Sequence, residues 1–171
     1  MEALLEALFG QAGLEIGAGE RALLAQHWQL LDAANQQFNL TAIAADAQAA
    51  EKHYLDSLLP LARIKEAAGG KQALLADIGS GGGLPAIPLA ICLPDLSFTL
   101  LEATGKKCAF LAAAGEKLGL ANLCVRKLRA EEAGQDPAFR AGFDFVTARA
   151  VARLPVLLEY CLPLVKTGGI F

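Results

Sequence analysis

The most constraining feature of this sequence is a glycine-rich loop that directly follows a short apolar segment. Residues 74–78 are apolar apart from Asp77, and residues 79–83 read Gly-Ser-Gly-Gly-Gly. Glycine adopts backbone conformations that other residues avoid, so the chain can turn sharply here and a ligand can approach it where no Cβ intervenes. In an open parallel sheet, ligands bind beyond the carboxyl ends of the strands. The motif predicts a strand, a ligand-binding turn and a helix; a tight turn without a ligand is the alternative.

Strands and helices alternate along the chain after this loop. Strand patterns recur at 97–101, 124–128 and 143–147, and another begins at 168. Helical patterns cover 84–92, 106–118 and 154–164. This alternation is typical of an α/β fold with a mostly parallel sheet. We therefore expect an α/β core over residues 72–171.

The first 66 residues are predicted to be helical. One helix carries an apolar stripe of Leu24, Trp28, Leu31 and Phe38, and we expect it to end near Asn39. A second is expected from Asp46, as its N-cap, to Lys65, with an apolar side made of Tyr54, Leu55, Leu58 and Leu59. The pair Gly69-Gly70 should end it. We expect these helices to pack against the sheet as an extension of a single domain, 1–171.

Composition excludes several classes of protein. A chain of 171 residues that is 54% hydrophobic can bury a core and is not a disordered protein. Glu2 and Glu6 stand where a signal peptide needs positive charge, and the apolar run 78–94 is broken by glycines and prolines. We therefore expect a cytoplasmic protein with no membrane segment. The four cysteines, which lack paired spacing, are expected to be buried free thiols and not a metal site; they are Cys92, Cys108, Cys124 and Cys161.

Charge is distributed unevenly along the chain. Residues 1–51 hold seven acidic residues and one basic residue, whereas residues 52–171 hold 11 acidic and 14 basic residues. The clustered bases are Lys106, Lys107, Arg126, Lys127, Arg129, Arg149 and Arg153. A nucleic acid would dock on this later part of the chain, although ordinary solvated surface explains these bases equally well.

The residues after the glycine loop bear on which ligand it takes. The dinucleotide fingerprint needs a third glycine at the position of Leu84, and the next residue, Pro85, has no N–H for a phosphate. No Gly-Lys-Ser/Thr sequence follows, which excludes a P-loop. The acid-x-Gly-x-Gly-x-Gly pattern from Asp77 instead resembles the first motif of class I S-adenosylmethionine-dependent methyltransferases. That cofactor carries no phosphate.

Glu102, at the end of the second predicted strand, is the expected ribose ligand. It lies 23 residues beyond Gly79, close to the spacing of about 20 for a ribose-binding acid. Both NAD and S-adenosylmethionine carry a free adenosine ribose, so an NAD-dependent oxidoreductase remains an alternative. Glu131 follows the third strand, where adenine would be held by Ala130-Glu131; a solvated loop is the other interpretation.

Motifs over nearly the whole chain are similar to those of one family. They are Asn-Leu-Thr at 39–41, His-Tyr-Leu-Asp-Ser at 53–57, Asp-Ile-Gly-Ser-Gly-Gly-Gly-Leu-Pro-Ala-Ile-Pro-Leu at 77–89, Phe-Thr-Leu-Leu-Glu at 98–102, Gly-Lys-Lys at 105–107, Arg-Ala-Glu-Glu at 129–132, Phe-Asp at 143–144 and Ala-Arg-Ala at 148–150. Their order and spacing resemble the glucose-inhibited division protein B family, the guanine-N7 methyltransferases of small-subunit (16S) ribosomal RNA.

The resemblance implies a Rossmann-like class I methyltransferase fold and S-adenosyl-L-methionine as cofactor. It implies rRNA methylation, with small-subunit ribosomal RNA or the 30S particle as partner and no metal or membrane. The cofactor-binding residues would be Gly79, Gly81, Gly83, Leu84, Glu102, Ala130, Glu131 and Arg149. Arg149 and His53 would be the catalytic residues, with Arg149 at the mouth of the pocket and Asn39 and His53 above it.

The sequence departs from the family after Gly168-Gly169-Ile170-Phe171. Family members continue with a lysine-bearing loop and a terminal antiparallel hairpin, so we expect the C-terminal strands to be missing and the fifth strand to form an exposed edge. A non-catalytic module that binds adenosylmethionine or RNA is therefore a further alternative.

Guanine-N7 methylation fits a chain without an evident general base. N7 is an unprotonated acceptor with a free lone pair, so the enzyme mainly aligns the reactants and excludes water. His53, Asp56 and Ser57 share a helical face, but a hydrolase is disfavoured because catalytic triads gather from separate elements. A structural role for His53 is as compatible with the sequence as a pocket role.

Overall fold

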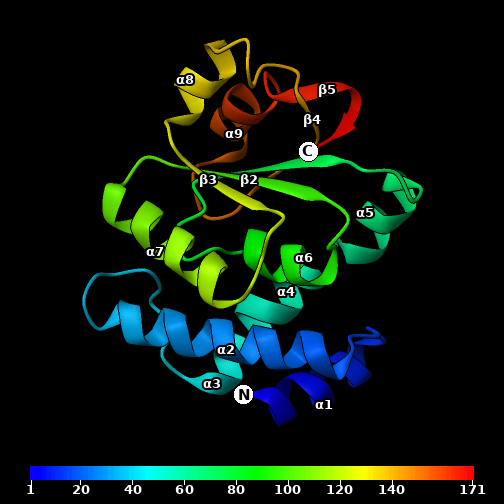
Figure 1. Cartoon of the computed structure of the whole chain (residues 1–171), viewed down its shortest axis with the longest axis vertical. Helices are drawn as coiled ribbons and strands as arrows, with labels where there is room; N and C mark the ends of the chain where they lie inside the picture. Colours follow the sequence, from blue (N-terminus) through cyan, green and yellow to red (C-terminus); the bar gives the residue numbers. More distant parts are fainter.

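A parallel sheet of five strands forms the centre of the computed structural model, which describes all residues 1–171 (Figure 1). The strands are β1 (Leu74–Ile78), β2 (Ser97–Glu102), β3 (Leu123–Lys127), β4 (Phe143–Ala148) and β5 (Val165–Ile170). They lie in the order β3-β2-β1-β4-β5, and every pair is parallel. The central position of β1 puts the loop after it at the point where the strand order reverses, which is where open α/β sheets bind ligands. The predicted α/β fold is confirmed, and β5 is the last strand on its side of the sheet.

Helices cover both faces of the sheet. They are α1 (Glu2–Ala12), α2 (Ala18–Asn35), α3 (Asp46–Ala49), the π-helix η1 (Ala50–Leu55), α4 (Asp56–Leu58), α5 (Leu61–Ala68), α6 (Ala86–Cys92), α7 (Gly105–Lys117), α8 (Ala130–Gln135) and α9 (Leu154–Cys161). Figure 1 shows α8 and α9 on one face and α6 and α7 on the other. The N-terminal helices form a further layer outside α6 and α7, and α2 contacts both. They therefore pack on the sheet mainly across α6 and α7.

The helix α2 ends at Asn35, earlier than predicted. The Asn35 side-chain oxygen accepts the backbone N–H groups of Leu40, at 2.8 Å, and Thr41, at 3.0 Å. A side chain that bonds the backbone beyond it competes with continuation of the helix. Phe38 therefore lies past the helix, although it still packs against the core.

The second predicted helix is divided by the π-helical segment η1 and by a break at Leu59 and Pro60. A π-turn changes the helical phase, because its hydrogen bonds run from i to i+5. Tyr54 and Leu58 are fully buried, whereas Leu59, predicted on the same apolar side, is 61% exposed. Asp46 does not cap a helix as predicted, because its carboxylate accepts Trp28 Nε1–H at 2.7 Å.

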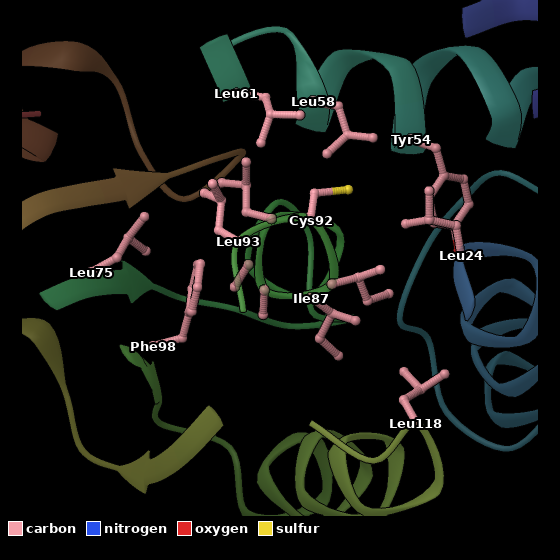
Figure 2. Packing of buried hydrophobic residues seen from close by; sticks show 14 of the residues in the cluster. Leu24, Tyr54, Leu58, Leu61, Leu75, Ile87, Cys92, Leu93, Phe98 and Leu118 are labelled. Atoms are coloured by element: carbon pink, nitrogen blue, oxygen red, sulfur yellow. The ribbon is translucent and has the colours of Figure 1, made fainter. Parts of the chain in front are cut away.

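The core is divided unequally by the sheet. One cluster of 30 buried residues joins the N-terminal helices, α6 and α7 to the sheet, and a cluster of eight lies under α8 and α9. Figure 2 shows Leu58 and Leu61 pointing toward α6 from the helical layer, with Leu75 and Phe98 approaching from the sheet. The N-terminal helices thus share the larger core with the sheet.

Some predicted boundaries need correction. The helix after β4 ends at Cys161 and not at 164, and β5 begins at Val165 and not at 168. The helix α8 was not among the predicted elements. All four cysteines are free, but only Cys92 and Cys161 are buried. Cys108, in α7, and Cys124, in the edge strand β3, are partly exposed. None of the helices has the length and apolar character needed to cross a membrane.

Candidate functional site

The glycine loop leaves β1 in a sharp turn. Gly79, Gly81 and Gly83 have φ values of 65°, 51° and 83°, in the left-handed region that favours glycine. The Gly79 N–H donates to Leu101 O at 2.8 Å, and the Gly83 N–H donates to Ser80 O at 2.6 Å. The first bond fastens the start of the loop to the end of β2, so the turn lies at the carboxyl edge of the sheet, as predicted.

The glycines differ in what occupies the space left by their missing Cβ atoms. A Cβ on Gly79 would lie 2.7 Å from Cγ2 of Val151, and one on Gly83 would lie 2.4 Å from Cδ1 of Ile87. A Cβ on Gly81 would meet only the backbone oxygen of Gly79, at 3.7 Å. Protein side chains therefore occupy the space that a Cβ would take at Gly79 and Gly83. Gly81 is the open position.

Glu102 binds the open part of the loop. Its carboxylate accepts the Gly81 N–H on Oε2 at 3.0 Å and the Thr104 N–H on Oε1 at 2.8 Å. The side chain is buried. Each carboxylate oxygen has a second lone pair, so both can accept a further hydroxyl proton. The residue predicted to bind ribose thus also fixes the loop from the side of β2.

Asp77 places a buried carboxylate beneath the loop. It is paired in register with Thr147 of β4, whose hydroxyl donates to Asp77 Oδ1 at 2.7 Å. Asp77 Oδ2 has no hydrogen-bond partner in the chain. Burial raises the pKa of Asp77 to about 6, against the opposing effect of the hydroxyls of Ser80 and Thr147. Asp77 is therefore a fully buried carboxylate with one unpaired oxygen beneath the loop.

Arg149 joins the sheet to the helical layer. It follows β4, and its Nη1 lies 2.8 Å from Asp56 Oδ2, 3.1 Å from Ser57 Oγ and 3.3 Å from the Lys52 carbonyl oxygen. All these contacts use one nitrogen of the guanidinium group. The remaining N–H groups of Arg149 are free to bind a ligand, since arginine carries five N–H donors.

His53 lies close to this arginine. Its Nε2 is 2.8 Å from Thr41 Oγ1, and burial, followed by the nearby Arg149 charge, lowers the pKa of His53. The Ser57 hydroxyl donates to the His53 backbone oxygen, and Asp56 pairs with Arg149. The Ser57 hydroxyl is thus not bonded to the His53 ring, and the Asp56 carboxylate does not orient that ring. These contacts do not form the hydrogen-bonded triad of a hydrolase.

The other predicted residues are more dispersed. Leu84 is half-buried at the end of the loop, and Ala130 and Glu131 begin α8 after β3. A hydrogen bond with the Glu131 carboxylate raises the pKa of Tyr160 in α9. The Glu131 side chain therefore lies next to α9. Asn39 is exposed beyond the end of α2.

The sequence analysis did not single out His27, and it placed Tyr54 only on the apolar side of a helix. His27 of α2 and Tyr54 of η1 are both fully buried, and a nitrogen of His27 lies 3.0 Å from the Gly82 carbonyl oxygen. The burial of His27 could have been predicted from its spacing. It is three residues from Leu24 and four from Leu31, so it shares their buried face of the helix.

The clustered bases follow the carboxyl ends of three strands. Lys106 and Lys107 lie in the first turn of α7, which follows β2, while Arg126, Lys127 and Arg129 are at the end of β3. Arg149 and Arg153 lie in the connection after β4. Parallel strands end at the same edge of a sheet, so the fold places these bases on the same side as the glycine loop.

Comparisons with known proteins agree on the family and the fold. The GidB family model, described as rRNA small subunit methyltransferase G, matches residues 20–171. The ribosomal RNA small subunit methyltransferase G of Sorangium cellulosum is 48% identical over 92% of this chain and 65% of its own length. That of Leuconostoc citreum is 41% identical over 99% of this chain and 70% of its own length. The chain thus spans about two thirds of these relatives.

Solved structures share the fold at low sequence identity. A Methanococcus maripaludis protein described as an S-adenosyl-L-methionine-dependent methyltransferase has a TM-score of 0.55 at 17% identity, over 72% of this chain and 58% of its own. A Plasmodium falciparum protein described as a protein-L-isoaspartate O-methyltransferase, in complex with S-adenosyl-L-homocysteine, has a TM-score of 0.56 at 15% identity, over 99% of this chain and 81% of its own. The fold is the Rossmann-like fold of class I methyltransferases. With this fold and the family match over residues 20–171, the chain belongs to the rRNA small subunit methyltransferase G (GidB) family.

Proposed function

We propose that this chain is an S-adenosylmethionine-dependent methyltransferase that modifies N7 of a guanine in small-subunit (16S) ribosomal RNA. The observation that carries the proposal is the open Gly81, whose N–H is bonded to the buried Glu102 carboxylate. Membership of the family supports the reaction, and the names of the relatives from S. cellulosum and L. citreum support the substrate class.

The residues present fit the cofactor. The open backbone at Gly81 gives it a surface to lie against, and the spare lone pairs of Glu102 suit the two ribose hydroxyls. Ala130 and Glu131 would lie at the adenine, and Leu84 would line the pocket. Gly79 and Gly83 would contribute by shaping the turn.

The same residues disfavour a nicotinamide dinucleotide. A pyrophosphate requires close approach and free N–H groups at the start of the following helix. Leu84 replaces the glycine that the dinucleotide motif needs, and Pro85, which has no N–H, immediately precedes α6. S-adenosylmethionine supplies an activated methyl group on a sulfonium and has no phosphate to accommodate.

The chemistry requires alignment more than proton transfer. The N7 lone pair forms a bond to the methyl carbon while the carbon–sulfur bond breaks, and the purine ring takes up the positive charge. No proton has to leave N7, so His53 need not act as a base. Arg149 has free N–H groups for guanine O6, an RNA phosphate or the cofactor carboxylate. It must leave N7 itself unoccupied.

The basic residues at the carboxyl edge of the sheet support an RNA substrate. Lys106, Arg126, Lys127, Arg129 and Arg153 are exposed there. Their positive charge attracts phosphates, whereas the chain as a whole has a formal net charge of −3. Small-subunit rRNA or the 30S particle would therefore approach this edge, and we assign the protein to the cytoplasm, where such particles are found.

Methyl transfer provides the test. The protein would be incubated with S-adenosylmethionine labelled in the methyl group and with 30S subunits lacking the modification, and labelled nucleosides would be identified after digestion. Label in 7-methylguanosine supports the proposal. Binding of S-adenosylmethionine without transfer would instead identify a non-catalytic module, and calorimetric binding of NADH alone would favour an oxidoreductase.

A further inference from the structure

A buried histidine of the helical layer is bonded to the glycine loop. His27 of α2 is fully buried, and its Nε2 lies 3.0 Å from the carbonyl oxygen of Gly82. Its other ring nitrogen, Nδ1, lies 3.0 Å from the hydroxyl oxygen of Tyr54. The two rings meet edge to face, with centroids 5.9 Å apart. Both ring nitrogens are therefore used, one on each side of the imidazole.

The partners of His27 determine its tautomer. A carbonyl oxygen only accepts hydrogen bonds, so the proton must be on Nε2. Nδ1 then carries a lone pair and accepts the Tyr54 O–H. The result is a directed chain from Tyr54 O–H to His27 Nδ1 and from His27 Nε2–H to Gly82 O. Burial lowers the pKa of His27 to about 4, which keeps the ring neutral near pH 7.

His27 is the sole hydrogen-bond donor to the Gly82 carbonyl. No backbone N–H of the chain donates to that oxygen. The adjacent Gly81 is bonded from the other side by Glu102. Because glycine places few steric limits on its backbone, these two bonds define the orientation of consecutive residues of the loop.

The packing around Gly82 is close. A Cβ on Gly82 would lie 2.8 Å from Cδ1 of Leu31, which is one helical turn beyond His27 on the same face of α2. Figure 2 shows Tyr54 pointing inward from the helical segment that carries Leu58. The loop is therefore covered from this side by α2 and η1, while Gly81 stays open.

From these contacts we propose that His27, oriented by Tyr54, is a positioning residue that holds the glycine loop in its cofactor-binding shape. The inference rests on the proposed function, because it assigns the N-terminal helices a part in cofactor binding. His27 touches neither cofactor nor substrate and acts only through the Gly82 peptide. Tyr54 acts one step further away, by keeping Nδ1 unprotonated.

Two amide substitutions separate this role from a merely structural one. In His27→Gln, the side-chain nitrogen has the same reach as Nε2 and can still donate to Gly82 O. In His27→Asn, the shorter side chain can meet Tyr54 but cannot reach Gly82. Both replace the aromatic ring by a buried amide. Gln29→Asn, on the exposed face of α2, controls for the helix propensity of asparagine.

Two readouts are needed: the dissociation constant for S-adenosylmethionine, by calorimetry, and hydrogen exchange of the loop amides 79–84 without ligand. We expect His27→Asn to weaken binding about tenfold and speed exchange by a similar factor, as expected for an unpaired buried carbonyl. For His27→Gln, the dissociation constant and the exchange rate should stay within about threefold of those of the unchanged protein. For Tyr54→Phe, both values should lie between those of His27→Gln and His27→Asn.

The proposal would be overturned if His27→Asn and His27→Gln had equal dissociation constants and equal loop exchange. It would also be overturned if His27→Asn gave the same values as the Gln29→Asn control. The exchange measurement does not depend on the cofactor. If the unchanged protein bound no S-adenosylmethionine, the proposed function would fail, while loop exchange would still decide whether His27 positions the loop.

Discussion

Arg149 Nη1 lies 2.8 Å from Asp56 Oδ2, which joins the end of β4 to the first residue of α4. This contact and the His27–Gly82 bond connect the N-terminal helices to the carboxyl edge of the sheet at two separate points. The helices thus contact the candidate site and are not only a cover for α6 and α7.

Replacing Arg149 by alanine should abolish most methyl transfer while leaving the fold intact. The ion pair is partly exposed, so its loss should lower the free energy of unfolding by about 1 kcal/mol or less. Misalignment of the reactants should lower kcat/KM about a hundredfold. Urea unfolding and methylation of 30S subunits measure the two effects.

Asp56→Ala is the matched control for Arg149→Ala, because it removes the same ion pair and leaves the guanidinium group in place. We expect a similar stability and a smaller loss of activity. An Arg149→Ala protein that is unfolded, or as active as Asp56→Ala, would show that Arg149 is a structural residue.

Gly81→Val should weaken S-adenosylmethionine binding strongly. Gly81 has φ 51°, and a branched side chain would project into the open space that the cofactor is proposed to occupy. The conformational strain should lower the free energy of unfolding by about 1–2 kcal/mol. Calorimetry should show a dissociation constant raised about a hundredfold, equivalent to about 3 kcal/mol.

Gly119→Val provides the comparison for this strain. Gly119 has φ 68° and open space around it, but it lies after α7, far along the chain from the loop. It should lose similar stability and keep its affinity for S-adenosylmethionine. Equal affinities in the Gly81 and Gly119 variants would refute the placement of the pocket.

Glu102→Gln should weaken both the loop and the ribose contact. The amide keeps one oxygen acceptor, so one of the N–H groups of Gly81 and Thr104 loses its partner. A lost hydrogen bond to a charged group costs about 1.5–3 kcal/mol. We expect lower stability in urea and weaker binding of both S-adenosylmethionine and adenosine, whereas methionine alone should bind unchanged.

The fold was largely predictable because its signals are local. The apolar run 74–78 is bounded by a glycine and matches β1 at both ends, and the alternation of strands and helices predicts a parallel sheet. Phe38 and Leu59 were misplaced because an Asn35 side-chain bond ends α2 and a π-turn shifts the helical phase. These effects depend on single interactions that periodicity does not show.

The site was predictable where strand ends determine it. Glu102 and Gly81 meet because β1 and β2 are neighbours. The spacing from Gly79 predicted Glu102 beside the glycine loop as a ribose ligand, but it did not predict the bond to Gly81. The contacts of Val151 with Gly79 and of His27 with Gly82 depend on how a loop and a helix pack in three dimensions. No spacing rule links residues so far apart in the sequence.

Asp77→Asn should change the pH dependence of stability. The pKa of Asp77 is raised from 3.8 to about 6 in the folded protein, so the folded state binds more protons than the unfolded state between these values. Its contribution to stability therefore falls as the pH rises from 3.8 to 6. Asparagine cannot ionise, so the stability of Asp77→Asn relative to the unchanged protein should rise by about 2 kcal/mol over this range.

His27→Gln should produce the opposite trend. The pKa of His27 is lowered from 6.5 to about 4, so the folded state binds fewer protons and its stability rises with pH between 4 and 6.5. The unchanged protein should therefore gain about 3 kcal/mol relative to His27→Gln across that window. Urea unfolding at several pH values measures both differences, and the contributions of other groups cancel. Between pH 4 and 6 the two trends oppose each other. Relative to the double variant, Asp77→Asn should therefore gain stability as the pH rises, and His27→Gln should lose it. Parallel stability curves for all four proteins would show that neither group changes its protonation behaviour on folding.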